Sequence, residues 1–121
     1  AVRLRPDYPE AHNNLGNALA AVGDLGGAER HLRESLRLKR SAVAMFNLGN
    51  LLLSARRAPE AAAVYEEALQ LDPRNALIHN NLGAAYLRSG RREDARAAFE
   101  QALRLNPSFQ DPGENLAKLR P

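Results

Sequence analysis

Three histidines are the side chains best suited to acid–base or metal chemistry in this chain of 121 residues. No two of His12, His31 and His79 have the spacing of metal ligands on one helix. Cysteine is absent, which excludes disulfides, thiolate metal sites and a cysteine nucleophile. No arrangement of serine, histidine and carboxylate suggests a nucleophilic site either. We therefore interpret the histidines as packing or surface residues and predict no catalytic residue, no metal site and no cofactor.

Arginines form a second set with possible chemistry, the binding of nucleic-acid phosphates. Arg30, Arg33 and Arg37 recur at helical spacing, and helical repeats can recognise RNA. Glu29 is four residues from Arg33, and Glu34 is four residues from Arg30, so both are placed for ion pairs along a helix. The formal net charge is only +3. We interpret this stripe as a solvated face, with an RNA-binding array as the disfavoured alternative.

Asparagine recurs in a pattern that local structure does not favour. Asn14, Asn47 and Asn81 each precede a Leu-Gly pair, although asparagine is a poor helix former. On a helical wheel Asn13 and Asn17 lie about 160° to either side of an apolar leucine, hence on the opposite face. The full set is Asn13, Asn14, Asn17, Asn47, Asn50, Asn80 and Asn81. These residues either bind a ligand, or they cap helices or form hydrogen bonds between neighbouring structural units.

The asparagines belong to an internal repeat. The Leu-Gly glycines Gly16, Gly49 and Gly83 are separated by 33 and 34 residues. Matching segments surround them at residues 11–19, 44–52 and 78–86. A second set of matching segments follows at residues 28–40, 61–73 and 95–107. Because both sets keep nearly the same offset in all three copies, the chain is built from one repeated structural unit.

Each unit has the apolar spacing of two helices. In the first helix large apolar residues recur four apart, as Leu15 and Leu19 do. A glycine inside such a helix costs about 1 kcal/mol relative to alanine. We therefore expect another helix to approach the three glycines closely. In the second helix a small residue precedes a large one by four positions: Ala28 and Leu32, Ala61 and Tyr65, and Ala95 and Phe99.

At these residues the chain resembles the tetratricopeptide-repeat family. The match includes the Leu-Gly pair, the alternating small and large residues, and the proline that ends the second helix at Pro73 and Pro107. The resemblance implies an all-α, right-handed superhelical solenoid of antiparallel helix pairs, whose first helices line a concave groove. The first unit departs from the pattern, because Ser35 and Arg40 replace the usual alanine and proline.

The resemblance divides the chain into three repeats with additional segments at both ends. The expected repeats are residues 9–41, 42–75 and 76–109. Residues 1–6 copy residues 102–107, so we interpret residues 1–8 as the end of a preceding repeat. Residues 110–121 are predicted to form a C-terminal helix that caps the apolar edge of the third repeat.

The linker between the first two repeats is one residue short and contains neither glycine nor proline. We predict a tight turn with Ser41 as the cap of the following helix, and therefore a monomer. One continuous helix through the linker would instead separate the halves and favour a domain-swapped dimer.

The predicted function is that of a non-catalytic scaffold for a protein or an extended peptide. The asparagines resemble those in the repeat domain of O-linked N-acetylglucosamine transferases, where such residues hold a polypeptide backbone. The predicted groove residues are Asn13, Asn14, Asn17, Phe46, Asn47, Asn50, Asn80, Asn81 and Arg88. The alternative is the substrate-recognition arm of a larger glycosyltransferase-type enzyme. Recognition of a chaperone C-terminus is disfavoured, because Asn13, Leu77 and Asn81 occupy positions where that class of repeat has lysines and an arginine.

Membrane insertion is not expected, because no stretch approaches the ~20 apolar residues of a membrane span. The sequence does not indicate a cellular compartment.

Overall fold

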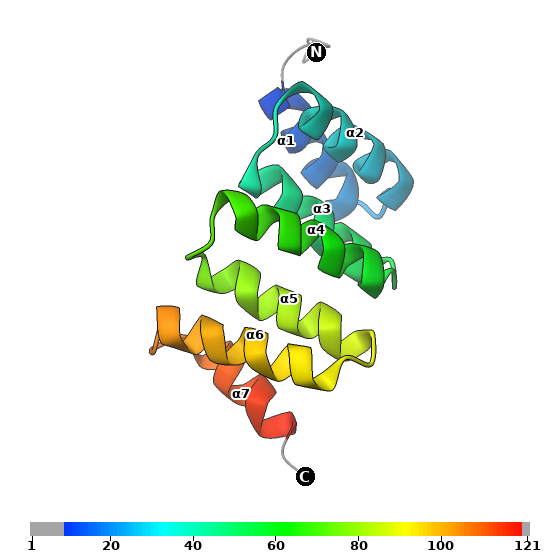
Figure 1. Cartoon of the computed structure of the whole chain (residues 1–121). Helices are drawn as coiled ribbons and strands as arrows, with labels where there is room; N and C mark the ends of the chain where they lie inside the picture. The colour runs from blue at the N-terminus through cyan, green and yellow to red at the C-terminus, as the bar shows by residue number, and fades with distance from the viewer. Residues whose placement is uncertain (1–8, 120–121) are drawn as a thin grey trace.

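The computed structural model describes residues 9–119, which contain seven α-helices and no strand (Figure 1). The helices are α1 (Pro9–Ala21), α2 (Leu25–Leu38), α3 (Ala42–Ser54), α4 (Ala58–Leu71), α5 (Ala76–Arg88), α6 (Arg92–Leu105) and α7 (Gln110–Lys118). The first six form three consecutive pairs, and α7 packs on α6 and α5. The predicted all-α solenoid of helix pairs is confirmed. The expectation for residues 1–8 lies outside the described residues, as do residues 120 and 121.

The short linker between the first two pairs folds as a capped turn. Helix α2 ends at Leu38, and Lys39 and Ser41 both have extended backbone before α3 begins. The Ser41 hydroxyl accepts a hydrogen bond from the Ala44 backbone N–H at 3.2 Å. The predicted Ser41 cap is therefore confirmed, and no continuous helix runs through the linker.

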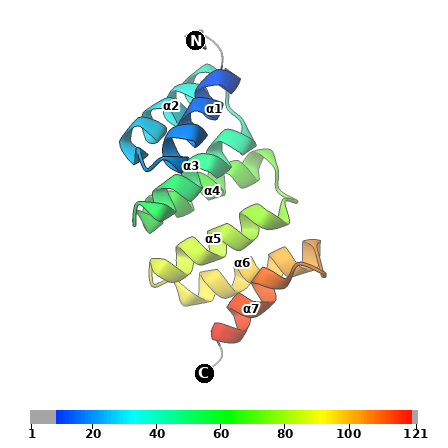
Figure 2. The ribbon, with the colours of Figure 1, turned by 180° about the vertical axis from the view of Figure 1, so that it is seen from behind.

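The odd-numbered helices form one face of the stack. In residues 9–119, α1 contacts α3, α3 contacts α5 and α5 contacts α7, whereas no two even-numbered helices pack directly on each other. Figure 1 shows α2, α4 and α6 on the near side, and Figure 2 shows the molecule from the side of α1, α5 and α7. The stack is tighter along the odd-numbered helices, and we call their side the inner face.

The glycines of the Leu-Gly pairs allow the two helices of each pair to approach closely. A Cβ on Gly49 would lie 2.5 Å from Cε1 of Tyr65, and one on Gly83 would lie 2.5 Å from Cε1 of Phe99. Both aromatic side chains are completely buried. The close helix approach expected at these glycines is confirmed.

Helix α7 covers the end of the third pair. Leu119, just after this helix, is buried and packs with Ala95 and Phe99 of α6. Leu116 of α7 joins the same cluster. The apolar surface that α6 would otherwise expose is thereby covered.

One turn stores backbone strain that its two counterparts avoid. Gly23 and Gly90 have positive φ angles of 89° and 79° in the turns inside the first and third pairs. Arg56 adopts a φ of 63° at the corresponding place in the second pair. We expect Arg56→Gly to raise the free energy of unfolding by about 1 kcal/mol, because side chains with a Cβ disfavour this conformation. Urea unfolding tests this, and Gly90→Ala should lower the stability by a similar amount.

Candidate functional site

The predicted groove residues all lie on the odd-numbered helices, hence on the inner face. They come from α1, α3 and α5. Asn14, Asn17 and Arg88 are exposed, whereas Asn80 is buried with 7% of its surface accessible. The remaining members are half-buried: Asn13, Phe46, Asn47, Asn50 and Asn81.

Asparagines of neighbouring repeats are hydrogen-bonded to each other in a fixed register. Asn47 Nδ2 donates to Asn13 Oδ1 at 3.1 Å, which joins α3 to α1. Asn115 Nδ2 donates to Asn80 Oδ1 at 3.2 Å, which joins α7 to α5. In both pairs the acceptor lies three residues before the Leu-Gly glycine of its own repeat. The donor lies two residues before the glycine, or the equivalent residue, of the following repeat. Sequence reasoning missed Asn115, although it precedes Leu116 just as the other asparagines precede the leucine of a Leu-Gly pair.

Phe46 interrupts this register between α3 and α5. Phenylalanine cannot accept the hydrogen bond, and Asn81 Nδ2 donates instead to Asn50 Oδ1 at 2.9 Å. The Tyr65 hydroxyl also donates to Asn50 Oδ1. Burial raises the pKa of Tyr65 well above its ordinary value, so the hydroxyl keeps its proton and remains a donor. The Phe46 ring lies 6.1 Å from the Tyr65 ring between centroids, which makes Phe46 partly a core residue.

The asparagines thus form hydrogen bonds between neighbouring repeats, one of the two roles considered for them. These bonds do not use every donor and acceptor of the side-chain amides. A side-chain amide has two N–H donors and two acceptor lone pairs. In the pair of Asn13 and Asn47, the bond uses one N–H of Asn47 and the oxygen of Asn13. The side-chain nitrogen of Asn13 can still donate hydrogen bonds, and the side-chain oxygen of Asn47 can still accept them. Asn14 and Asn17 make no hydrogen bond with another described residue, so they are the most available amides of the set.

One cavity opens between two helices of the inner face, and a second lies at the ends of α3 and α5. The first, of about 260 Å³, lies between α1 and α3 and is lined by Asn17, Asn47 and Asn50 over an apolar floor. The second, of about 440 Å³, is lined by Leu53, Arg56, Ala58 and Arg88. Arg88 reaches across to the preceding repeat, where its Nη1 donates to the Leu53 carbonyl at 3.4 Å. The first cavity therefore brings three predicted residues together, whereas Arg88 is the one predicted residue at the second.

Two histidines that are distant in the sequence meet inside the first helix pair. His12 of α1 and His31 of α2 approach with their Nδ1 atoms 3.0 Å apart. Sequence reasoning did not find this pair, because the contact depends on the register of the α1–α2 hairpin. His79 lies elsewhere and contacts the Pro73 carbonyl through Nε2 at 2.9 Å. Among residues 9–119, no group of three or more histidine, aspartate or glutamate side chains could hold a metal ion.

Glutamates neutralise much of the arginine stripe on α2. Arg33 Nε lies 2.9 Å from Glu29 Oε2, as predicted. The prediction that Arg30 pairs with Glu34 is wrong, because the side chain of Arg37 binds Glu34 through Nε at 2.9 Å. That a nucleic acid is not the partner stays a prediction.

An ion pair also joins the first repeat to the second away from the inner face. Arg57 Nη1, just before α4, lies 2.6 Å from Glu29 Oε1. Arg57 also pairs with Glu60. The hydrogen bond from Arg57 holds the pKa of Glu29 below its ordinary value.

Sequence models of the tetratricopeptide repeat match residues 10–44, 49–90 and 76–109, which together make up most of the chain. The chain belongs to the tetratricopeptide-repeat family. No curated protein sequence matches it significantly. No helix in the described part of this tetratricopeptide-repeat chain has the length and apolar character needed to cross a membrane.

Solved structures, among them two tetratricopeptide-repeat domains, have the same fold. The domain of Arabidopsis OM64 is 23% identical with a TM-score of 0.88, and 93% of each chain is covered. The first domain of Spaghetti (RPAP3), bound to an HSP90 peptide, is 17% identical with a TM-score of 0.90, covering 98% of this chain and 95% of that one. Pseudomonas aeruginosa pilF is 28% identical with a TM-score of 0.89, and 94% of this chain matches 53% of that longer chain.

Proposed function

We propose that this tetratricopeptide-repeat chain is a non-catalytic module that binds an extended polypeptide along its inner face. The observation that carries the proposal is the cavity lined by Asn17, Asn47 and Asn50. A peptide unit offers one N–H donor and one carbonyl acceptor, and an asparagine side chain complements both. Binding of a peptide by the first domain of RPAP3 supports this use of the fold.

The spacing of the repeats matches an extended chain. Helices pack about 8–10 Å apart, so equivalent asparagines in adjacent repeats are separated by roughly 10 Å. An extended peptide advances ~3.3 Å per residue, so asparagines on α1, α3 and α5 meet the ligand about once every three residues. Recognition through the ligand backbone favours extended peptides and depends little on their sequence. Leu77, which is 45% exposed on α5, adds an apolar contact.

The test begins with a synthetic pool of random peptides with free C-termini. The chain is expected to retain a subset of peptides, which mass spectrometry identifies. Affinity of one retained peptide is then measured for the double variant Asn14→Ala, Asn17→Ala. Each neutral hydrogen bond contributes about 0.5–1.5 kcal/mol, so the double variant should bind about five- to a hundredfold more weakly. These two exposed residues are chosen because they make no inter-repeat bond with the described residues.

The matched control is Gln70→Ala, which removes an exposed side-chain amide from the even-numbered helix α4. It should leave peptide affinity unchanged. Replacing Asn14, Asn47 and Asn81 together should weaken binding about a hundredfold if each loses one hydrogen bond to the ligand. That variant also breaks two inter-repeat bonds and should therefore melt earlier. Unchanged affinity in the folded double variant would contradict binding through these asparagines.

The same inner face would also serve the substrate-recognition arm of a glycosyltransferase-type enzyme. That alternative differs only in what is covalently attached to the repeats. A catalytic domain in the parent gene would support it over a free-standing scaffold.

A further inference from the structure

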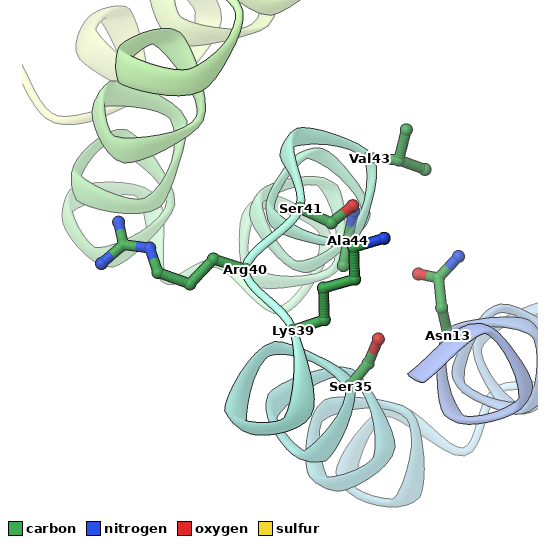
Figure 3. A pocket seen from close by; sticks show the side chains of 7 residues that line it. All are labelled: Asn13, Ser35, Lys39, Arg40, Ser41, Val43 and Ala44. Carbon is green, nitrogen blue, oxygen red and sulfur yellow. The ribbon is translucent and has the colours of Figure 1, made fainter. Parts of the chain in front are cut away.

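A polar pocket lies where the first repeat meets the second. Its volume is about 370 Å³, and it is formed by the end of α2, the linker and the first turn of α3, together with Asn13 of α1 (Figure 3). Its other polar lining residues are Ser35, Lys39, Arg40 and Ser41, and Val43 also lines it. Because Asn13 and Val43 belong to α1 and α3, the pocket adjoins the inner face. We call it the Lys39 pocket.

The side chains of this pocket are suited to an anion. Figure 3 shows the Lys39 side chain extending toward Ser41 and Ala44, with the Ser35 hydroxyl and the Asn13 amide directed at the same space. No carboxylate is among the described residues that line the pocket. Lys39 also forms no ion pair within residues 9–119. The Lys39 ammonium, the Ser41 hydroxyl and the Asn13 amide together offer several hydrogen-bond donors to one negatively charged group.

The neighbouring Arg40 also lines the pocket, but its guanidinium does not belong to this group of donors. Its side chain is directed away from the pocket toward α4 (Figure 3), and its Nη2 lies 3.9 Å from Glu67 Oε2. Lys39 and Arg40 are adjacent, exposed and equally charged, but only one of them extends into the pocket. This pair therefore separates a specific contact from the general effect of positive charge.

The corresponding places in the other repeats lack a cation. Asp72 occupies the position of Lys39 after the second repeat, and it accepts a hydrogen bond from Asn75 Nδ2 at 3.0 Å. Asn106 occupies it after the third repeat and accepts a hydrogen bond from the Ser108 hydroxyl at 3.0 Å. The linker is also one residue shorter at the first junction. The first repeat thus differs from the other two at Ser35, at Lys39 and in the length of its linker. All three differences lie at this one pocket.

We propose that the Lys39 pocket binds a carboxylate of the polypeptide held on the inner face, a proposal that rests on the function proposed above. The carboxylate belongs to an aspartate or glutamate side chain or to the C-terminus of the ligand. Val43, which is 63% exposed, contacts an apolar residue next to it. Asn13 and Asn17 are one helical turn apart, about 6 Å along the axis of α1, so the Lys39 pocket and the asparagine cavity lie on the same stretch of a ligand that crosses the repeats, displaced sideways from each other. The chain thereby selects acidic peptides although its backbone contacts are unselective.

The test repeats the selection from the random peptide pool with wild-type chain, Lys39→Gln and Arg40→Gln. Wild-type chain is expected to enrich peptides with a carboxylate at one position. Lys39→Gln should lose this enrichment and bind a selected peptide about tenfold more weakly, since the lost hydrogen bond is charge-assisted. Arg40→Gln should keep both the enrichment of acidic peptides and the affinity for the selected peptide. Both replaced side chains are exposed, so thermal melting should be unchanged in the two variants.

Two altered peptides identify the source of the carboxylate. Replacing the enriched acidic residue by its amide removes the side-chain source, and amidation of the C-terminus removes the other. The peptide that loses affinity for wild-type chain, but not for Lys39→Gln, reports the group that occupies the pocket.

Four outcomes would overturn the proposal. Peptides enriched without an acidic preference, or an acidic preference that survives in Lys39→Gln, would refute the pocket while leaving peptide binding intact. Equal losses in Lys39→Gln and Arg40→Gln would show general electrostatic attraction instead. No enrichment of any peptide by wild-type chain would refute both the pocket and the proposed function.

Discussion

Replacing Gly83 with alanine is expected to lower the free energy of unfolding by about 1–3 kcal/mol, although alanine is the better helix former. The added Cβ would lie 2.5 Å from Cε1 and 2.6 Å from Cδ1 of Phe99. The Phe99 ring is completely buried, so it cannot move aside without disturbing its neighbours. Overpacking therefore outweighs the gain of about 1 kcal/mol in helix propensity. Urea unfolding followed by far-UV circular dichroism measures the change.

The same substitution at Gly26 provides the control. Gly26 lies in the first turn of α2, and nothing lies within 4 Å of the position its Cβ would take. Gly26→Ala should therefore raise the stability by up to about 1 kcal/mol through helix propensity alone. Gly49→Ala should behave like Gly83→Ala, because its Cβ would meet the Tyr65 ring at 2.5 Å. A stabilised Gly83→Ala variant would contradict close packing as the reason for glycine here.

Replacing Leu119 with alanine is expected to destabilise the C-terminal end of the stack by about 2–5 kcal/mol, the usual cost of truncating a buried leucine. Leu119 retains only 2% of its surface and packs against Ala95 and Phe99. Each repeat contacts only its neighbours, so the loss should be local rather than uniform. Hydrogen exchange should show lower protection in α6 and α7, with α1 to α4 nearly unchanged.

Leu71→Ala is the matched control for this prediction. Leu71 is 48% exposed at the end of α4, so the same change of side chain removes little buried surface. Its effect on protection should be small throughout the chain. Equal loss of protection in all helices of Leu119→Ala would show that the stack unfolds as one cooperative unit.

The helix pairs were predictable from the sequence because their determinants are local or repeated. The spacing of Leu15 and Leu19 defines a buried stripe, and the position of Ser41 defines a helix start. Even the close approach at the glycines followed from the cost of glycine inside a helix. The placement of the asparagines opposite the apolar stripe was likewise a matter of helical period.

Only the tertiary structure decided what those asparagines contact. Asn47 donates to Asn13 because of the way adjacent repeats are offset. The position two residues before the glycine in one repeat lies opposite the position three residues before the glycine in the preceding repeat. Asn81 donates a hydrogen bond to Asn50 because the Phe46 side chain cannot accept one. The meeting of His12 with His31 and the direction of Lys39 into a pocket also depend on how helices cross. Sequence period fixes which face a side chain occupies, but its partner across a helix junction is set by the packing of two surfaces, which no single helix contains.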